Sequence, residues 1–508
     1  MSIQTELNMP SIRLKEICLL ILIFGLLFFT LLGNRPLFVP DEGRYAEIAR
    51  EMVESGDYLI PHLNGILYFE KPPLFYWLSS LSFKLFGIHV AAIRAINALL
   101  GALGCLLTYV IASKLYDQKI GFFSALILAS SLLYFTMAHM VTLDMAVTFF
   151  ITGALYAYLI GFKETHPLKR RGYFYLTAIA MALAVLTKGL IGILFPISII
   201  VCWLFFNKHL SKPFSDRAFQ QSTYLPSSII LFLLLTLPWH LIVQHTHPEF
   251  LHFYIVEHHF LRYTDLSIGH NEPIWFFIPY LLLGFLPWTF FLLQTIRMQY
   301  QTWRKKEPSF SINLYFIIWV LFIFIFFSFS KSKLIPYILP LFPALSILTA
   351  QYVVRFKENH CMLGILFTIA GLLTLLFYAP HMDHRTIFPL AKQLKHDLKL
   401  SDWVITYNQY YQDLPFYLGR KVAVLNWKNE LAFGMAHQKT NERMINDATF
   451  FRRWHSQKQI YVIISQSEYD AFKKAHPNDH AIVLGKTKTN YLITNRAPQS
   501  APLDLLSH

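Results

Sequence analysis

Hydrophobic and polar residues occur along this chain in long, separate blocks. Apolar runs of about 17 to 22 residues, the length of a helix that crosses the hydrocarbon core of a bilayer, recur as far as residue 379. Two further stretches, 72–87 and 248–263, fit interfacial or re-entrant helices, so the expected range is eleven to thirteen crossings. The eleven expected spans are residues 17–33, 90–113, 120–138, 143–162, 173–187, 189–206, 226–244, 274–295, 311–329, 334–353 and 360–379.

The pattern changes after Pro380. Short β-rich runs alternate with helical patterns, which is typical of a small α/β domain. The runs are 403–407, 422–425 and 460–464, and the helical patterns are 386–398, 443–456 and 467–475. The sequence therefore predicts a polytopic α-helical membrane domain at 1–380, with a long loop at 34–88, followed by a soluble α/β domain at 381–508.

The distribution of basic residues predicts the orientation. If the N-terminus is cytoplasmic, every cytoplasmic loop is basic, as the positive-inside bias requires. These loops carry Lys114, Lys119, Lys163, Lys169, Arg170, Arg171, Lys208, Lys212, Arg217, Arg297, Arg304, Lys305, Lys306, Arg355 and Lys357. Contact with anionic lipid explains the net charge of +14, and we expect no nucleic-acid partner. Loops 34–89, 139–142, 187–189, 245–273 and 330–333 and the C-terminal domain then face the other side.

Acidic residues in these opposite-side loops lie close to the membrane, where charge is costly and often functional. Asp41 opens an amphipathic stretch that predicts a helix along the membrane face, and the alternative role for Asp41 is to cap that helix. Glu70 and Lys71 precede Pro72, so they are either functional or an interfacial pair before a helix start. Asp144 lies among apolar residues at the mouth of a span, with a buried structural hydrogen bond as its alternative.

Four cations share this side of the membrane with the acids. Phosphate oxygens accept several charge-assisted hydrogen bonds, so a cationic pocket at headgroup level suits a lipid-linked phosphate. Ordinary headgroup contact is the alternative for each cation taken singly. The four are Lys188, Arg262, Lys331 and Lys333.

Metal binding is left open. The histidines at 245, 247, 252, 258, 259 and 270 include no two that are three or four residues apart, the spacing that places two ligands on one helical face. Carboxylates from Asp41, Glu70 or Asp144 are an equally open alternative. The four cysteines fit no metal or redox spacing. We expect no obligatory cofactor and leave a divalent cation open.

Several segments resemble bacterial lipid-carrier-dependent glycosyltransferases of the C-type fold, and most closely the group that transfers 4-amino-4-deoxy-L-arabinose to lipid A. The resemblance is carried by residues 40–52, 55–58, 61–65 and 68–74 of the first loop, and by 187–189, 257–262, 330–337 and 414–418. Two features depart from the family pattern. Gly43 stands where the family commonly has Ala, which we expect to loosen the helix start, and the soluble domain is short.

The resemblance implies a donor sugar carried on undecaprenyl phosphate and transferred, on the periplasmic face of the bacterial inner membrane, to a lipid A phosphate or another lipid or glycan acceptor. It implies catalytic roles for Asp41 and Asp144. Carrier or acceptor phosphates would be bound by Lys71, Arg262, Lys331, Lys333 and Tyr337. Tyr45, Tyr68 and Glu70 would line the sugar site, and the substrate-binding set is completed by Glu42, Arg44, Lys188 and His259.

Two other functions remain as alternatives. A related polyprenyl-phosphate-sugar transferase, such as a mannosyltransferase, would act on protein or on another glycan. A transporter would place charges near the middle of the membrane and show repeated halves. In this chain the charges gather at one face.

Overall fold

The structure is a computed structural model that describes residues 13–207, 224–264, 272–356, 358–382, 386–440 and 442–497. Its contacts divide the chain into two compact units. The first, called here the membrane unit, consists of residues 1–32, 69–75 and 94–376. The second unit consists of residues 33–68, 76–93 and 377–508. The predicted domain boundary at residue 380 stays a prediction; the contacts group much of the first loop with the C-terminal segment.

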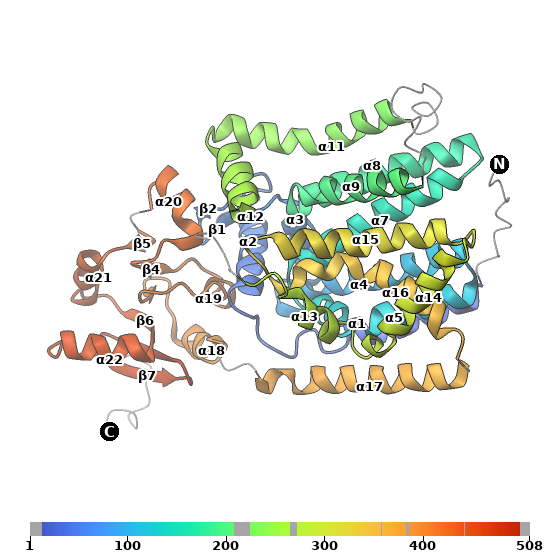
Figure 1. Cartoon of the computed structure of the whole chain (residues 1–508). Coiled ribbons are helices and arrows are strands. Elements are labelled where there is room, and N and C mark those ends of the chain that lie inside the picture. The colour runs from blue at the N-terminus through green and yellow to red at the C-terminus, as the bar shows by residue number, and fades with distance from the viewer. Residues whose placement is uncertain are drawn as a thin grey trace. The chain divides into compact units, whose positions relative to one another are not determined.

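Every expected span is helical in the structure, although several differ in length or are broken (Figure 1). The helices are α1 (Leu14–Phe29), α4 (Val90–Leu115), α5 (Gln118–Ser130), α6 (Leu132–Ala138), α7 (Leu143–Lys163), α8 (Pro167–Lys188), α9 (Ile191–Phe206), α11 (Leu225–Thr246), α13 (Phe277–Gly284), η3 (Trp288–Phe291), α14 (Leu292–Arg304), α15 (Phe310–Phe329), η4 (Ile335–Leu341), α16 (Phe342–Val353) and α17 (Glu358–Met382). The interfacial stretches form α3 (Leu74–Phe86), the π-helix η2 (His252–Leu261) and α12 (Arg262–Thr264).

Fewer of these helices are long and apolar enough to cross a membrane than the sequence predicts. Among the described residues, six helices are long and apolar enough, or eight if two bent pairs each count as one span. The pairs are α5 with α6, bent by 67°, and α13 with the segment 288–304, bent by 104°. Helices α1 and α9 have only 16 residues each, which is short for a full crossing. The range of eleven to thirteen crossings therefore stays a prediction, while the polytopic helical class is confirmed.

Several helices of the membrane unit pack against the next helix in the chain (Figure 1). These pairs are α7 with α8, α8 with α9, and α15 with α16; in addition, α11 packs on α8. Buried aromatic side chains join them. The indole Nε1 of Trp319 donates to Pro340 O at 2.8 Å, and the Tyr315 hydroxyl donates to Leu155 O at 2.8 Å. These bonds satisfy polar groups where water is absent, so the aromatic core has a fixed register.

The C-terminal segment forms the α/β domain that the sequence predicts. Its six-stranded sheet has the order β5-β4-β3-β6-β8-β7, with β3, β4, β5 and β6 parallel and β8 antiparallel to both β6 and β7. The strands are β3 (Trp403–Thr406), β4 (Ala423–Leu425), β5 (Met444–Ile445), β6 (Ile460–Ser465), β7 (Ile482–Lys486) and β8 (Asn490–Thr494). The helices are α18 (Phe388–Asp397), α19 (Leu414–Leu418), α20 (Ala432–His437), α21 (Asp447–Trp454) and α22 (Gln466–Ala475), with the 3-10 turn η5 (Asn429–Leu431).

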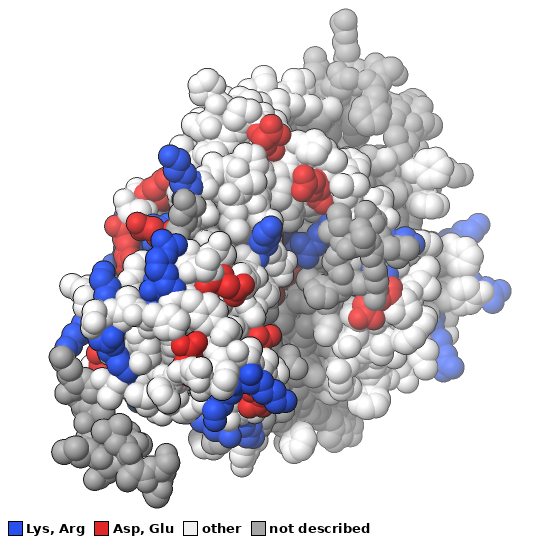
Figure 2. Space-filling model, turned by 90° about the vertical axis from the view of Figure 1, so that its left-hand side faces the viewer, with Lys and Arg blue, Asp and Glu red and all other residues white. Residues whose placement is uncertain are grey.

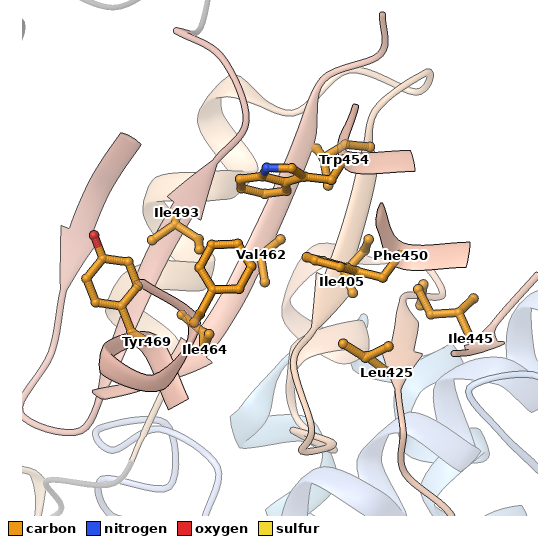
Figure 3. Close-up of a cluster of buried hydrophobic side chains, with 12 residues drawn as sticks. Ile405, Leu425, Ile445, Phe450, Trp454, Val462, Ile464, Tyr469 and Ile493 are labelled. Carbon is orange, nitrogen blue, oxygen red and sulfur yellow. The ribbon is translucent and has the colours of Figure 1, made fainter. Parts of the chain in front are cut away.

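One hydrophobic cluster holds this domain together (Figure 3). Side chains of β3, β4 and β6 meet aromatic residues of α21 and α22, and Figure 3 shows Phe450 and Trp454 over the strand residues Ile405 and Val462. Phe450 and Trp454 stack with ring centroids 5.7 Å apart. The predicted strands at 403–407, 422–425 and 460–464 are confirmed, whereas β5, β7 and β8 were not predicted.

The first loop contributes helix α2 (Asp41–Ser55) and a two-stranded hairpin, β1 (His62–Leu63) and β2 (Ile66–Leu67), to the second unit. Asn64 and Gly65 form the turn with φ values of 55° and 70°, which suits the Asn-Gly pair. The sequence predicts α2 as an amphipathic helix along the membrane face; the helix is confirmed, and its location at the membrane face stays a prediction. Its polar side is enclosed: Glu47 is 0% exposed and Arg50 1%.

Gly43 faces the backbone of residue 413 within the second unit. A Cβ atom at Gly43 would lie 2.6 Å from Asp413 N and 2.9 Å from Asp413 Cα, too close for any side chain. The expected loosening of the helix start is therefore not the main consequence of this glycine. It permits close packing of α2 on the segment that leads into α19.

We predict that Gly43→Ala lowers thermal stability although alanine is the better helix former. The helix preference is worth about 1 kcal/mol, and overpacking against a backbone atom costs about 1 to 3 kcal/mol. The matched control is Gly172→Ala in α8, where nothing lies within 4 Å of the added Cβ. Unfolding midpoints in detergent should fall for Gly43→Ala and stay or rise for Gly172→Ala; a rise in both would contradict the close packing.

Candidate functional site

Asp41 is the first residue of α2, and its side chain is 47% exposed. No side chain caps this helix, and the residue before it is Pro40, so the capping alternative for Asp41 is wrong. The carboxylate faces Arg44, whose Nη1 lies 3.4 Å from Asp41 Oδ1. The dipole of α2 favours a negative charge at this N-terminus.

Glu42, the neighbouring acid, has a structural set of contacts. Its carboxylate is fully buried and accepts hydrogen bonds from Arg35 Nη1 at 2.7 Å and from Arg35 Nη2 at 3.2 Å. It also accepts a hydrogen bond from the Phe38 backbone N–H at 2.7 Å. A bidentate Arg–carboxylate pair fixes geometry as well as charge. Glu42 therefore holds the segment before α2, and the predicted substrate role of Glu42 stays a prediction.

Arg44 connects Asp41 to the C-terminal domain, within the second unit. Arg44 Nη2 lies 3.8 Å from Glu430 Oε1, which also accepts a hydrogen bond from Gln412 Nε2 at 2.6 Å. The buried Tyr410 hydroxyl belongs to the same region; burial first, and then the nearby carboxylates of Glu47, Glu51 and Glu430, raise the pKa of Tyr410. Glu430 and Gln412 are residues that sequence reasoning missed, because 370 or more residues separate them from Asp41.

Tyr45 and Tyr68, predicted to line a sugar site, are buried at 6% and 1% exposure. The Tyr45 ring packs against the Tyr76 ring at 6.1 Å, and the Tyr68 backbone N–H donates to Pro61 O. Both side chains belong to the core of the second unit, and their predicted role in sugar binding stays a prediction.

The membrane unit contains a second polar group. The Lys188 ammonium pairs with the Asp144 carboxylate and lies 4.7 Å from the centre of the Tyr337 ring. Asp144 is in the first turn of α7 and Lys188 in the last turn of α8, so each charge is favoured by the dipole of its own helix. Both side chains are 13% exposed. The structure thus brings Asp144, Lys188 and Tyr337 together, while the catalytic and binding roles predicted for them stay predictions.

His259 holds the turn that follows Lys188. Its Nδ1 lies 2.6 Å from Tyr254 O and its Nε2 accepts the Leu190 backbone N–H at 3.3 Å. Gly189, with φ of 92°, leaves room for the imidazole, since a Cβ there would overlap it. Both ring nitrogens are thus engaged by backbone groups. His259 acts on Lys188 through the turn, a structural role that spacing in the sequence does not reveal.

Charged residues of the 69–75 and 252–264 segments form one electrostatic group in the membrane unit. The pKa of His258 is lowered to about 4, chiefly by burial. The charge of Glu70 acts to raise this pKa, and the charges of Lys71 and Arg262 act to lower it. Burial likewise lowers the pKa of His259 to about 4, followed by the effect of Lys71. The two imidazoles are therefore neutral at physiological pH, and the cations Lys71 and Arg262 dominate this group.

Lys331 and Lys333 have different environments. The Lys333 ammonium is buried and donates to Ser330 O at 2.5 Å and to Glu272 O at 2.8 Å. Burial first, and then the charge of Lys331, lower the pKa of Lys333. The Lys331 side chain is exposed, while its backbone N–H donates to Tyr263 O at 3.0 Å. Lys333 thus holds the turn, and Lys331 presents its charge to the surroundings.

A metal centre has no support among the described residues, where no group of three His, Cys, Asp or Glu side chains is placed to hold an ion. His270 and the cationic positions 208, 212, 217 and 357 lie outside the described residues. The divalent cation stays an open prediction.

The lowered pKa values predict a histidine-linked loss of stability in acid. The unfolded chain takes up these protons near pH 6.5, whereas the folded chain resists protonation down to about pH 4. The unfolded state therefore binds more protons in this window, and stability falls as the pH falls.

The measurement compares the slope of melting temperature against pH between 6.5 and 4. His258→Gln/His259→Gln should flatten this slope, whatever its effect on stability at pH 7. The control His245→Gln removes an exposed histidine and should keep the wild-type slope. An unchanged slope in the double variant would contradict the buried neutral state.

Family comparisons agree with these motifs. Residues 15–254 match the family described as dolichyl-phosphate-mannose-protein mannosyltransferase, and residues 390–494 match the aminoarabinose transferase C-terminal domain. Two relatives are named undecaprenyl phosphate-alpha-4-amino-4-deoxy-L-arabinose arabinosyl transferase. That of Aeromonas hydrophila is 35% identical over 65% of this chain, and that of Enterobacter sp. is 30% identical over 71%. The matched regions span 58% and 65% of those relatives.

Solved structures show the same architecture. ArnT from Cupriavidus metallidurans bound to undecaprenyl phosphate is 25% identical, with a TM-score of 0.84 over 96% of this chain and 99% of that one. The oligosaccharyltransferase AglB from Archaeoglobus fulgidus, at 15% identity, has a TM-score of 0.52 over 97% of this chain and 75% of its own. The second likeness concerns the fold alone. The chain belongs to the family of lipid-carrier-dependent glycosyltransferases that includes the aminoarabinose transferases.

Proposed function

We propose that this protein transfers 4-amino-4-deoxy-L-arabinose from undecaprenyl phosphate to a phosphate of lipid A at the periplasmic face of the bacterial inner membrane. The observation that carries the proposal is the match of both the membrane region and the C-terminal domain to aminoarabinose transferases, together with the likeness to a structure bound to undecaprenyl phosphate. The six or more membrane-capable helices are consistent with a lipid-linked donor.

Asp41 is the carboxylate that we assign to the reacting centre. The Asp41 carboxylate is exposed, whereas that of its neighbour Glu42 is buried, and Arg44 Nη1 lies 3.4 Å from Asp41 Oδ1. A phosphate monoester acceptor is largely dianionic at neutral pH, since its second pKa is near 6, so it needs no strong base. Asp41 would then orient the nucleophile or stabilise positive charge that develops on the sugar.

The bond changes place a negative charge on the leaving group. The acceptor phosphate oxygen attacks the anomeric carbon of the sugar, and the bond from that carbon to the undecaprenyl phosphate oxygen breaks. We assign neutralisation of that phosphate to Lys71 and Arg262, which form one electrostatic group with the neutral His258. Lys188 is already paired with Asp144, so we assign this pair to positioning.

A protein mannosyltransferase remains the second candidate, because residues 15–254 match that family. The C-terminal domain favours aminoarabinose transfer, since residues 390–494 match a domain of those transferases. A transporter has no comparable support.

Asp41→Asn is predicted to lower transfer on the order of 10²-fold or more, because it removes the charge and keeps the shape. Lipid A from a deletion strain that carries the variant should lack aminoarabinose by mass spectrometry, while the wild-type gene restores it. Asp470→Asn, an exposed acid of the C-terminal domain, is the control and should restore modification. Normal lipid A with Asp41→Asn would rule out the assignment, and lipid A that is unmodified even with the wild-type gene would favour the mannosyltransferase alternative.

Glu430→Gln tests whether the C-terminal domain positions Asp41 through Arg44. Loss of the Glu430 charge should strengthen the attraction between Arg44 and the Asp41 carboxylate and displace that carboxylate. We expect kcat to fall about tenfold, the effect of ~1.4 kcal/mol, with KM nearly unchanged. Glu442→Gln, an exposed acid in the same domain, is the control. A change in KM alone, or an equal effect in both variants, would contradict the positioning role.

A further inference from the structure

The C-terminal domain contains a cavity that is separate from every residue assigned to sugar transfer. Its volume is about 1000 Å³. It is lined by Asn426, Trp427, Lys428, Met435, Met444, Ile445, Asn446, Thr449, Arg452 and Arg453. All ten residues belong to the second unit, and none is among the motifs that carry the family resemblance.

The cavity lies beside the carboxyl ends of two parallel strands. Strands β4 and β5 are parallel, with Leu425 paired to Ile445, and the residues that follow them are Asn426 and Asn446. The Asn426 backbone N–H donates to Ile445 O at 3.1 Å, so the two strand ends stay together. Ligands of open α/β sheets bind outside the carboxyl ends of the strands, at the point where the strand order reverses. That point is between β3 and β6 in this sheet, so the cavity shares the strand ends but not the reversal point.

The charged lining is entirely cationic: Lys428, Arg452 and Arg453, with no Asp or Glu. Arg453 is fixed by stacking on Trp403 at 3.6 Å and by donating to Glu442 O, and Arg452 Nη2 donates to Thr449 Oγ1 at 3.3 Å. Figure 2 shows Lys and Arg interspersed with Asp and Glu on the face in view, so a purely cationic lining is a local feature. Arginine and lysine together are suited to phosphate.

The uncharged lining suits a sugar ring. Trp427, Met435 and Met444 supply apolar surface. The Asn426 amide nitrogen donates to Asn408 Oδ1 at 3.2 Å and to Asp447 Oδ1 at 3.0 Å, which leaves the amide oxygen as the acceptor that Asn426 offers. The Trp427 indole Nε1 is buried, and no hydrogen-bond acceptor for it exists among the described residues. A buried donor of this kind gains a partner when a ligand with hydroxyl or phosphate oxygens enters.

We propose that this cavity binds a phosphorylated saccharide. Lys428 and Arg452 hold the phosphate, and the sugar ring packs on Trp427. A volume of about 1000 Å³ is at the upper end of small-molecule sites. The phosphorylated saccharide comes either from solution or from the headgroup of a glycolipid, and the two share this chemistry. The site is independent of the proposed transfer reaction.

The test measures binding of glucose 1-phosphate to the full chain in lipid nanodiscs by calorimetry, with glucose and inorganic phosphate as comparison ligands. Glucose 1-phosphate should bind at least about tenfold more tightly than either comparison ligand. Lys428→Gln/Arg452→Gln should lower its affinity about tenfold or more, since both phosphate contacts are lost. Lys474→Gln, an exposed lysine of the same domain outside the cavity, is the matched control and should bind as the wild type.

Two further measurements distinguish a soluble ligand from a glycolipid headgroup and separate binding in this cavity from sugar transfer. Lipid A added to the nanodisc displaces glucose 1-phosphate if the ligand is a glycolipid headgroup, and does not if the ligand is soluble. Asp41→Asn should bind glucose 1-phosphate normally, so failure of the transfer assignment leaves this test intact. Equal affinity in wild type and the double variant, or no preference for glucose 1-phosphate over inorganic phosphate, would overturn the site.

Discussion

The buried ion pair between Arg50 and Glu47 is the interaction on which the placement of Asp41 depends. Arg50 Nε and Nη2 donate to the two Glu47 oxygens at 2.7 and 2.6 Å, and both side chains are almost fully buried. A buried charge without its partner costs about 3 to 5 kcal/mol. Each of the two charges therefore needs the other where protein encloses α2, and the pair holds the helix that begins at Asp41.

The enclosure comes from the hairpin that follows α2 and from the C-terminal domain. Glu51 accepts the Gly65 backbone N–H at 2.9 Å, and the Asn64 side chain both donates to Val422 O and accepts Val422 N–H at 2.9 Å. Arg443 Nη1 then donates to Gly65 O at 2.8 Å. The hairpin of the first loop is thus fixed to the C-terminal domain, and the same contacts fix α2. In the membrane unit, the neutral His259 side chain likewise fixes a turn, the one beside Lys188, through hydrogen bonds to backbone groups.

Much of the fold could be predicted because apolar length and β-rich runs are local signals. All expected spans are helical, and three strands were located from their composition. The missed strand β5 has only two residues, Met444 and Ile445, too few for a pattern. The enclosure of α2 was missed because its interleaved charged and apolar residues fit a surface helix and an enclosed helix equally well. Only the contacts made by Asn64, Gly65 and the C-terminal domain distinguish the enclosed helix from a surface helix. In the site, Asp144 and Lys188 were predicted together, whereas Glu430 and the clamp by His259 depend on tertiary contacts that no spacing encodes.

The environments of two neighbouring acids, Asp41 and Glu42, and of two nearby lysines, Lys331 and Lys333, differ in burial. Glu42 and Lys333 are buried and bonded to Arg35 and to backbone carbonyls, while Asp41 and Lys331 are exposed. Of the two acids, the exposed Asp41 is therefore the one assigned to the reacting centre. The most direct test is reconstitution of the purified chain with undecaprenyl-phosphate-linked 4-amino-4-deoxy-L-arabinose and lipid A. The account predicts lipid A that gains the mass of one aminoarabinose residue and release of undecaprenyl phosphate; unmodified lipid A from a folded, donor-binding protein would contradict it.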